Sequence, residues 1–239
     1  CISWIYGTSG HLQFDIIANV VASDPAVNSL GLWFGLAFLL VGIAFKFGAV
    51  PFHMWLPDVY NGARSPVTLY VASAPKIAAF ALTFRILVDG LGGLHPGWND
   101  MVMVIAVLSL LLGNIVAIAQ SNIKRMLAYS PIGHVGFILL GIFVGTEQGY
   151  AAALFYTLTY VLTAAAAFGI VIVLSRKGYE AESMSDFRGL NVRRPWFALM
   201  MMFVMFRMAG IPPIVGFFAK LNAISAVVDA GYTGLAVIM

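Results

Sequence analysis

Two lysines that lie inside apolar stretches are the residues of this sequence best suited to chemistry. Lys46 and Lys76 are 30 residues apart, and each lies in an apolar run long enough to cross a membrane. A lysine near the middle of a bilayer costs about 3 kcal/mol on insertion scales, so such residues usually face the protein interior and mark an ion or proton path. A buried lysine can also take up and release a proton when its surroundings change. The pair therefore predicts a proton relay.

Two further residues are candidates for the same relay. Lys220 lies late in an apolar span that is interrupted by glycine and proline, and His134 lies deep in another span. Lysines near helix ends can instead extend to the membrane surface, which is the alternative interpretation for Lys46 and Lys220. A lone buried histidine is more often a hydrogen-bonded packing residue, although its ordinary pKa also suits proton transfer. Arg207 cannot deprotonate, so we expect it to be a fixed charge.

The composition places these residues in a membrane. Of 239 residues, 61% are hydrophobic and 10% are charged, whereas a soluble domain carries about a quarter charged residues. We therefore expect an all-α, multi-pass protein embedded in the lipid bilayer. A net charge of +3 gives no basic face for nucleic acid. A single cysteine, Cys1, excludes an internal disulfide and argues against a Cys-ligated cluster, so no cofactor or metal is expected in this chain.

The hydropathy pattern predicts one transmembrane domain over residues 1–239. Two spans are expected to be discontinuous because prolines interrupt them, and such helices commonly line hydrated cavities in transporters. The chain starts without Met and stops in an apolar run, so we expect an interior piece of a longer membrane protein. The expected spans are about 28–57 (broken), 66–88, 101–120, 124–145, 150–174, 195–221 (broken) and 223–239 (truncated).

The connectors between these spans alternate in charge. Residues 89–100 and 146–149 contain no Lys or Arg, whereas 58–65, 121–125 and 175–194 do. Because positive residues favour the cytoplasmic side, the second set is expected there. The long polar stretch 175–194 is then a cytoplasmic connector. No acidic residue lies inside a complete predicted span, so an acidic partner for the lysines must come from other sequence or from another chain.

Four motifs resemble a known family. They are FKFGAVPFHMWLPDVYNGA, SAPKIAAFAL, QSNIKRMLAYSPIGHVGF and AGIPPIVGFFAKL. In order and spacing they resemble the antiporter-like membrane subunits of the proton-pumping NADH:quinone oxidoreductase, respiratory complex I, and the resemblance covers residues 1–239. The PDVY form of the first motif favours the N-type subunit over the M- and L-types and over subunits of sodium/proton antiporters, which share the fold.

This resemblance implies a fold with two inverted five-helix repeats, each with one discontinuous helix, of which this chain holds an incomplete set. Lys46 would be the lysine of the first broken helix, Lys76 the central lysine and Lys220 that of the second broken helix, with His134 on the same polar axis. The family pairs the first lysine with a glutamate on an earlier helix, which would precede residue 1.

The resemblance also implies partners and a location. The chain would translocate protons as a subunit of NADH:quinone oxidoreductase, driven by remote redox chemistry, beside other membrane subunits of complex I. NADH, FMN, iron–sulfur clusters and quinone would bind to partner subunits, and the bacterial inner membrane is the expected location. The alternatives are a cation/proton antiporter subunit and a purely structural membrane subunit.

Two positions depart from the family pattern. Arg64 stands where comparable members have proline, and Arg207 stands where they have a small polar residue. A fixed charge at Arg207 is expected to repel the proton-bearing form of Lys220.

Overall fold

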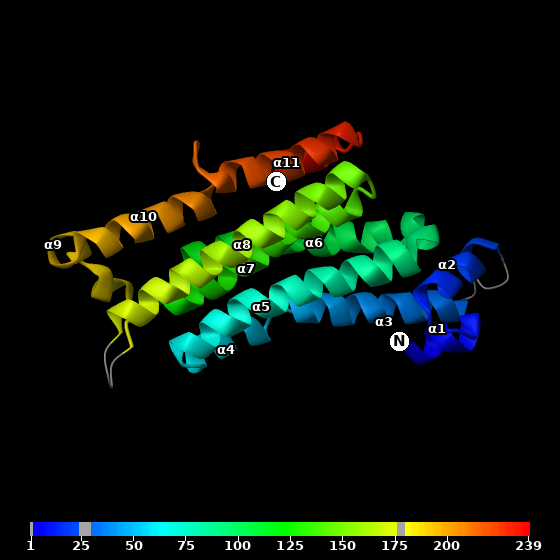
Figure 1. Ribbon diagram of the computed structural model, residues 1–239, viewed down its shortest axis with the longest axis horizontal. Coiled ribbons are helices and arrows are strands. Elements are labelled where there is room, and N and C mark those ends of the chain that lie inside the picture. Colours follow the sequence, from blue (N-terminus) through cyan, green and yellow to red (C-terminus); the bar gives the residue numbers. More distant parts are fainter. Residues whose placement is uncertain (1, 24–29, 176–179) are drawn as a thin grey trace.

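The computed structural model describes residues 2–23, 30–175 and 180–239, and these form an elongated bundle of helices (Figure 1). Five described segments are long and apolar enough to cross a membrane, and in them the backbone groups are satisfied within each helix. They comprise α3 (Leu30–Phe47), α5 (Ser65–Phe84) with the π-helical turn η2 (Arg85–Gly90), the 3₁₀ turn η3 (Gly92–Leu94) with α6 (His95–Ile118), α7 (Ile123–Phe143) and α8 (Glu147–Leu174). The expected all-α membrane architecture is confirmed.

Both expected discontinuities are present. α4 (Trp55–Gly62) follows α3 after a turn, and α11 (Val215–Asp229) follows α10 (Pro195–Ala209) as the next piece of one rod along the edge of the bundle (Figure 1). Each first half ends at a glycine in the left-handed region, Gly48 with φ 70° and Gly210 with φ 83°. Glycine is the usual residue here because the absent Cβ removes the steric penalty of positive φ. Prolines then prevent the helix from resuming at once.

Several expected boundaries are wrong. α6 begins at His95 rather than at 101, because Pro96 lies in its first turn, where a missing N–H costs nothing. The second broken span continues to Asp229 rather than ending at 221, and no new span begins near 223. Alanines at helical spacing keep one face of α11 buried beyond that point. Gly231, with φ 90°, then separates α11 from α12 (Thr233–Ile238).

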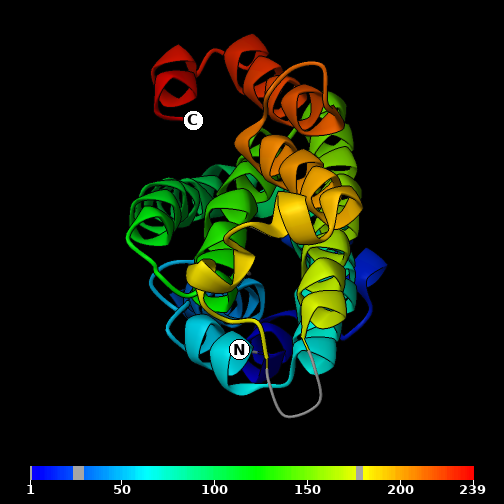
Figure 2. The same cartoon turned by 90° about the vertical axis from the view of Figure 1, so that its left-hand side faces the viewer.

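The amino-terminal stretch also forms helices. α1 (Ile2–Ser9) and α2 (Phe14–Ser23) are separated at Gly10, which has φ 70°. In Figure 2, which views the bundle along its length, α1 to α4 lie at one edge, and α10 and α11 lie at the other edge beside α8.

Successive long helices alternate in direction, so the connectors gather at the two ends of the bundle (Figure 1). One end carries the α4–α5 turn, the α6–α7 turn and the segment with η4 (Met184–Phe187) and α9 (Leu190–Arg193). These are the connectors that contain Lys or Arg, and their described parts lie at the same end of the bundle. That this end faces the cytoplasm stays a prediction. Arg176 and Lys177, which were counted with them, lie outside the described residues.

α7 is the centre of the bundle. In its apolar 18-residue stretch 83% of the residues are buried, a larger share than in any other described span. Small residues allow α6 to approach it closely: a Cβ added at Gly113 would lie 2.4 Å from the backbone nitrogen of Gly133. Helices in membranes associate largely through such close packing, because lipid offers little hydrophobic driving force. The α6–α7 contact therefore fixes the element that carries His134.

We expect Gly113→Ala to destabilise the bundle by about 1–3 kcal/mol, because a methyl group there overpacks the α6–α7 contact. The measurement is the thermal midpoint of the full-length protein in its native complex. Gly169→Ala on α8 is the control, since a Cβ there meets no atom within 4 Å. Equal midpoints for the two variants would contradict this packing role.

Candidate functional site

At the first break, a lysine binds the end of a half-helix. The Lys76 side chain of α5 is buried, with the residue only 2% exposed. Its Nζ donates a hydrogen bond to the carbonyl oxygen of Phe47, the last residue of α3. The last carbonyls of a helix have no intrahelical partner and carry partial negative charge, which a cation stabilises. The break therefore creates the binding partner that Lys76 needs in an apolar interior.

At the second break a lysine also binds the end of a half-helix, but here the lysine belongs to the half-helix that follows the break. Lys220 of α11 donates a 3.0 Å hydrogen bond from Nζ to the carbonyl oxygen of Ala209, the last residue of α10. A Cβ at Gly210 would lie 2.9 Å from Cδ of Lys220, so glycine also gives the side chain its passage. In each broken span, a lysine ammonium thus binds the terminal carbonyl of the first half-helix.

Lys46 lies beside this first site, but its side chain points out of the described bundle. It occupies the last turn of α3, its side chain is exposed, and no described carboxylate lies within 4.0 Å of it. Its place next to Phe47 puts two lysines at the first break, one inside and one outside the described bundle. The predicted pairing of Lys46 with a glutamate of an earlier helix concerns sequence outside this chain and stays a prediction.

His134 belongs to a buried aromatic group. Its Nδ1 lies 2.7 Å from the hydroxyl oxygen of Tyr156, and its ring lies 5.2 Å from that of Tyr160. Phe137, one turn further along α7, stacks on Tyr156 with ring centroids 5.3 Å apart. Lys220 completes the group, since its Nζ lies 5.4 Å from the Phe137 ring centroid. The structure thus brings His134 and Lys220 into one contiguous cluster.

The sequence analysis did not identify any tyrosine as a candidate site residue. Tyr156 and Tyr160 are four residues apart on α8, so both hydroxyl-bearing rings lie on one helix face toward His134. That spacing inside an otherwise apolar span was the available signal. Tyr60 of α4 is a further case, because it is fully buried, packs edge-on against Phe168, and its hydroxyl has no hydrogen-bond partner among the described residues.

Lys124 lies in the connector 121–125, whose positive residues were used above only to orient the chain, and the structure gives its side chain several partners. It is 1% exposed and its Nζ binds the Ala63 carbonyl at 3.1 Å, Glu182 Oε1 at 3.0 Å and the Glu180 carboxylate. The Ser65 hydroxyl donates to the same Glu180 carboxylate at 3.0 Å. We call this group of four side chains, those of Lys124, Glu180, Glu182 and Ser65, the lysine clasp.

The lysine clasp fastens the connector to the ends of the helices. The Ile123 N–H donates to the Glu182 carbonyl at 2.7 Å, and the Met184 N–H donates to the Ser121 carbonyl at 3.2 Å. The hydrogen bond from Lys124 holds the pKa of the Glu180 carboxyl below its usual value. Glu180 therefore stays ionised at neutral pH, and the clasp links the α4–α5 turn, the start of α7 and the segment that leads to α10.

The interior charges are unbalanced. Lys76, Lys220 and Arg207 lie inside described spans, whereas the described acidic residues lie in connectors, in short helices or within six residues of the end of a longer helix. Among the described residues, no group of three or more His, Cys, Asp or Glu could hold a metal ion. What the site offers is a set of cations, a histidine and tyrosines at two helix breaks, and lysine and histidine side chains can take up and release protons.

Comparison with known proteins finds relatives along the whole chain. The family described as NADH:quinone oxidoreductase/Mrp antiporter, TM matches residues 1–239. A protein of Thioalkalivibrio sulfidiphilus named NADH-quinone oxidoreductase subunit N is 56% identical over 236 residues, which are 99% of this chain and 49% of that protein. The chain therefore spans about half the length of the curated relatives it matches.

Solved structures agree on the fold. Respiratory complex I from Thermus thermophilus with bound aureothin contains a chain that is 33% identical, with a TM-score of 0.80 over 99% of this chain and 50% of that chain. The Mrp complex from a Dietzia species contains a chain that is 28% identical, with a TM-score of 0.87 over 99% of this chain and 43% of that chain. The resemblance seen in the four sequence motifs is confirmed.

We expect Lys124→Met to release the connector, because two carboxylates and the Ala63 carbonyl lose their common donor. The measurement is amide hydrogen exchange of the segment 180–187 at pH 7, which should lose protection. Arg85→Gln is the control, since it removes an exposed ion pair with Asp89 at the opposite end of the bundle. Unchanged protection in Lys124→Met would contradict the clasp.

The clasp should also depend on pH. Because the folded-state pKa of Glu180 is depressed, its contribution is present above the ordinary value of 4.5 and is lost as the pH falls through the lower folded value. Exchange protection of segment 180–187, corrected for intrinsic rates, should therefore be constant from pH 8 down to about 4.5 and fall below it. Glu180→Gln should abolish this pH dependence.

Proposed function

This chain belongs to the NADH:quinone oxidoreductase/Mrp antiporter transmembrane family, and on that premise we propose that it translocates protons as a membrane subunit of an NADH:quinone oxidoreductase. The subunit naming of relatives that match 99% of the chain supports this choice. The electrons would move in partner subunits, where we expect NADH, FMN, iron–sulfur clusters and quinone to bind. We further propose the bacterial inner membrane as the location and other membrane subunits of complex I as the partners.

The observation that carries the proposal is the lysine bound to the terminal carbonyl of each broken helix. An ammonium group at Lys76 is held by the Phe47 carbonyl. When the proton leaves, the neutral amine binds that carbonyl less strongly, because a charge-assisted hydrogen bond is replaced by a neutral one. A nearby charge or a small movement of the half-helix can thus shift Lys76 between holding and releasing a proton.

The second half of the path uses His134 and Lys220. The hydrogen bond between His134 Nδ1 and the Tyr156 hydroxyl gives a route for a proton within the aromatic cluster. Phe137 lies between that pair and the ammonium of Lys220. Proton transfer along this line needs water between the aromatic cluster and Lys220, and the open backbone of the break beside Lys220 can hold it.

We assign roles to four residues. Lys46 would accept protons at the first break, on the outside of the described bundle, and Lys76 would hold them in the interior. His134 would pass them toward α11, and Lys220 would release them at the second break. Coupling to remote redox chemistry would act by changing the charge beside Lys46.

A cation/proton antiporter subunit is the second candidate function. The 28% identical chain of the Mrp complex supports it, as does the family itself, which includes Mrp antiporters. The same lysines would then be driven by an ion gradient. Sodium-dependent proton flux without NADH would favour this candidate over the first.

We expect Lys76→Met to abolish proton pumping in the full-length complex, because methionine fills the same volume but carries no proton. Pumping is measured by dye quenching in inverted vesicles, together with NADH oxidation and the amount of assembled complex. The control is Arg85→Gln, which removes an exposed cation next to the end of α5 and should pump normally. Normal pumping by an assembled Lys76→Met complex would show that the lysine is structural.

A further inference from the structure

Arg207 lies inside the second broken span, and the proton path proposed above gives it no role. The residue is 9% exposed, and none of the described residues forms an ion pair or a side-chain hydrogen bond with its guanidinium. A guanidinium stays charged and has five N–H donors. A buried ion without a partner is strongly unfavourable in an apolar interior, so this charge calls for an anion.

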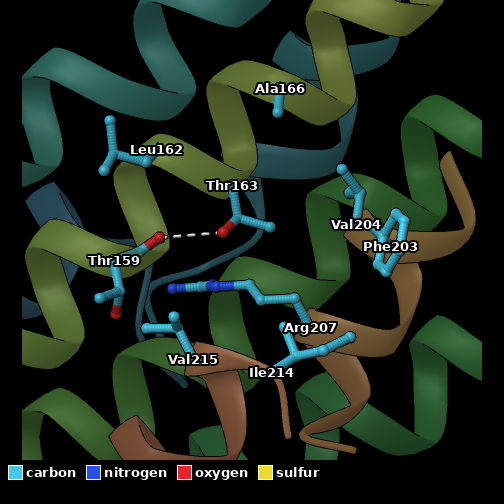
Figure 3. Close-up of a pocket in the computed structure, with 9 residues that line it drawn as sticks. All are labelled: Thr159, Leu162, Thr163, Ala166, Phe203, Val204, Arg207, Ile214 and Val215. Carbon is cyan, nitrogen blue, oxygen red and sulfur yellow. Dashed lines mark hydrogen bonds between the residues drawn. The ribbon is translucent and has the colours of Figure 1, made fainter. Parts of the chain in front are cut away.

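A cavity of about 340 Å³ lies at this guanidinium. In Figure 3 the Arg207 side chain extends from α10 across the hollow toward Thr159 and Thr163 of α8, and Ile214 and Val215 at the start of α11 line another part of it. The remaining walls are apolar and come from α8 and α10. The hollow is open on one side, where Leu162 and Phe203 are exposed, so the largely buried guanidinium lies at its inner wall.

The start of α11 supplies a second attraction for negative charge. Ile214 and Val215, the N-cap and first residue of this 15-residue helix, line the cavity. The first N–H groups of a helix have no intrahelical acceptor, and the helix dipole places partial positive charge there. A helix N-terminus and a guanidinium that face one cavity form a suitable pair of donors for an anion.

The neighbouring polar groups do not neutralise Arg207. The hydroxyl groups of Thr159 and Thr163 donate to backbone carbonyls of α8. The Ala209 carbonyl at the end of α10 is bonded to Lys220, which adds a second cation at the same break. Both cations lie in a region where no described carboxylate is within 4.0 Å of either one.

We propose that the cavity between α8, α10 and α11 binds a chloride-sized inorganic anion, held by the Arg207 guanidinium and the first N–H groups of α11. The volume of the hollow exceeds that of a single ion, so the anion would keep part of its water shell. Each water molecule occupies about 30 Å³. Its charge would offset the repulsion between Arg207 and Lys220. The site goes beyond the proposed proton translocation and does not depend on it.

The test is binding of radioactive chloride to the purified full-length complex in gluconate buffer. Unmodified complex should show a saturable site from which bromide displaces the label and gluconate does not. Arg207→Gln should weaken this site by at least about tenfold, because a desolvated charge partner is lost. Arg207→Lys should retain weaker binding, and it keeps the test informative if the glutamine variant does not assemble.

Two controls separate the result from other effects. Arg85→Gln should bind chloride normally, since its charge is exposed and paired with Asp89. Lys76→Met should also bind normally, so the outcome does not depend on whether Lys76 moves protons. Equal binding by Arg207→Gln and unmodified complex would overturn the proposal. A carboxylate side chain within 4 Å of the Arg207 guanidinium in the full-length protein would also overturn it.

Discussion

A helix that stops inside a membrane leaves its last carbonyl groups without partners, and a lysine inside a membrane needs an acceptor for its charge. In this protein each feature satisfies the other. Lys76 binds the end of α3, and Lys220 binds the end of α10. The breaks are therefore not isolated irregularities, because they provide the polar groups that allow two cations to occupy an apolar bundle.

The two breaks are alike in backbone but differ in what binds them. Gly48 and Gly210 both end a half-helix at positive φ. At the first break the lysine comes from a separate span, α5, whereas at the second break it comes from α11, the second half of the broken span itself. Only the second break has an arginine in the last turn before the glycine. The lysine clasp ties the end of α4, after the first break, to the segment that leads into α10, before the second break. The two broken spans are therefore joined at one end of the bundle.

Much of this was accessible from the sequence, because apolar runs and prolines have direct structural consequences. The broken spans, the alternation of charged connectors and the burial of Lys76 were predicted correctly. The extension of α11 was not, since Lys220 and Asn222 look like a boundary until packing shows which face they occupy. The clasp was missed because Lys124 lies 56 positions from Glu180 and 58 positions from Glu182 in the sequence. No local pattern indicates a pairing over such separations. The aromatic cluster around His134 depends in the same way on how α7 and α8 pack.

We propose that Lys76 works by exchanging a proton and not merely by carrying a charge. The most direct test is Lys76→Arg in the full-length complex, since arginine keeps the positive charge and can still donate to the Phe47 carbonyl but does not release its proton. We expect this variant to assemble and to lose proton pumping. An assembled Lys76→Arg complex that pumps at the normal rate would contradict the account, because a fixed charge at the break would then be sufficient.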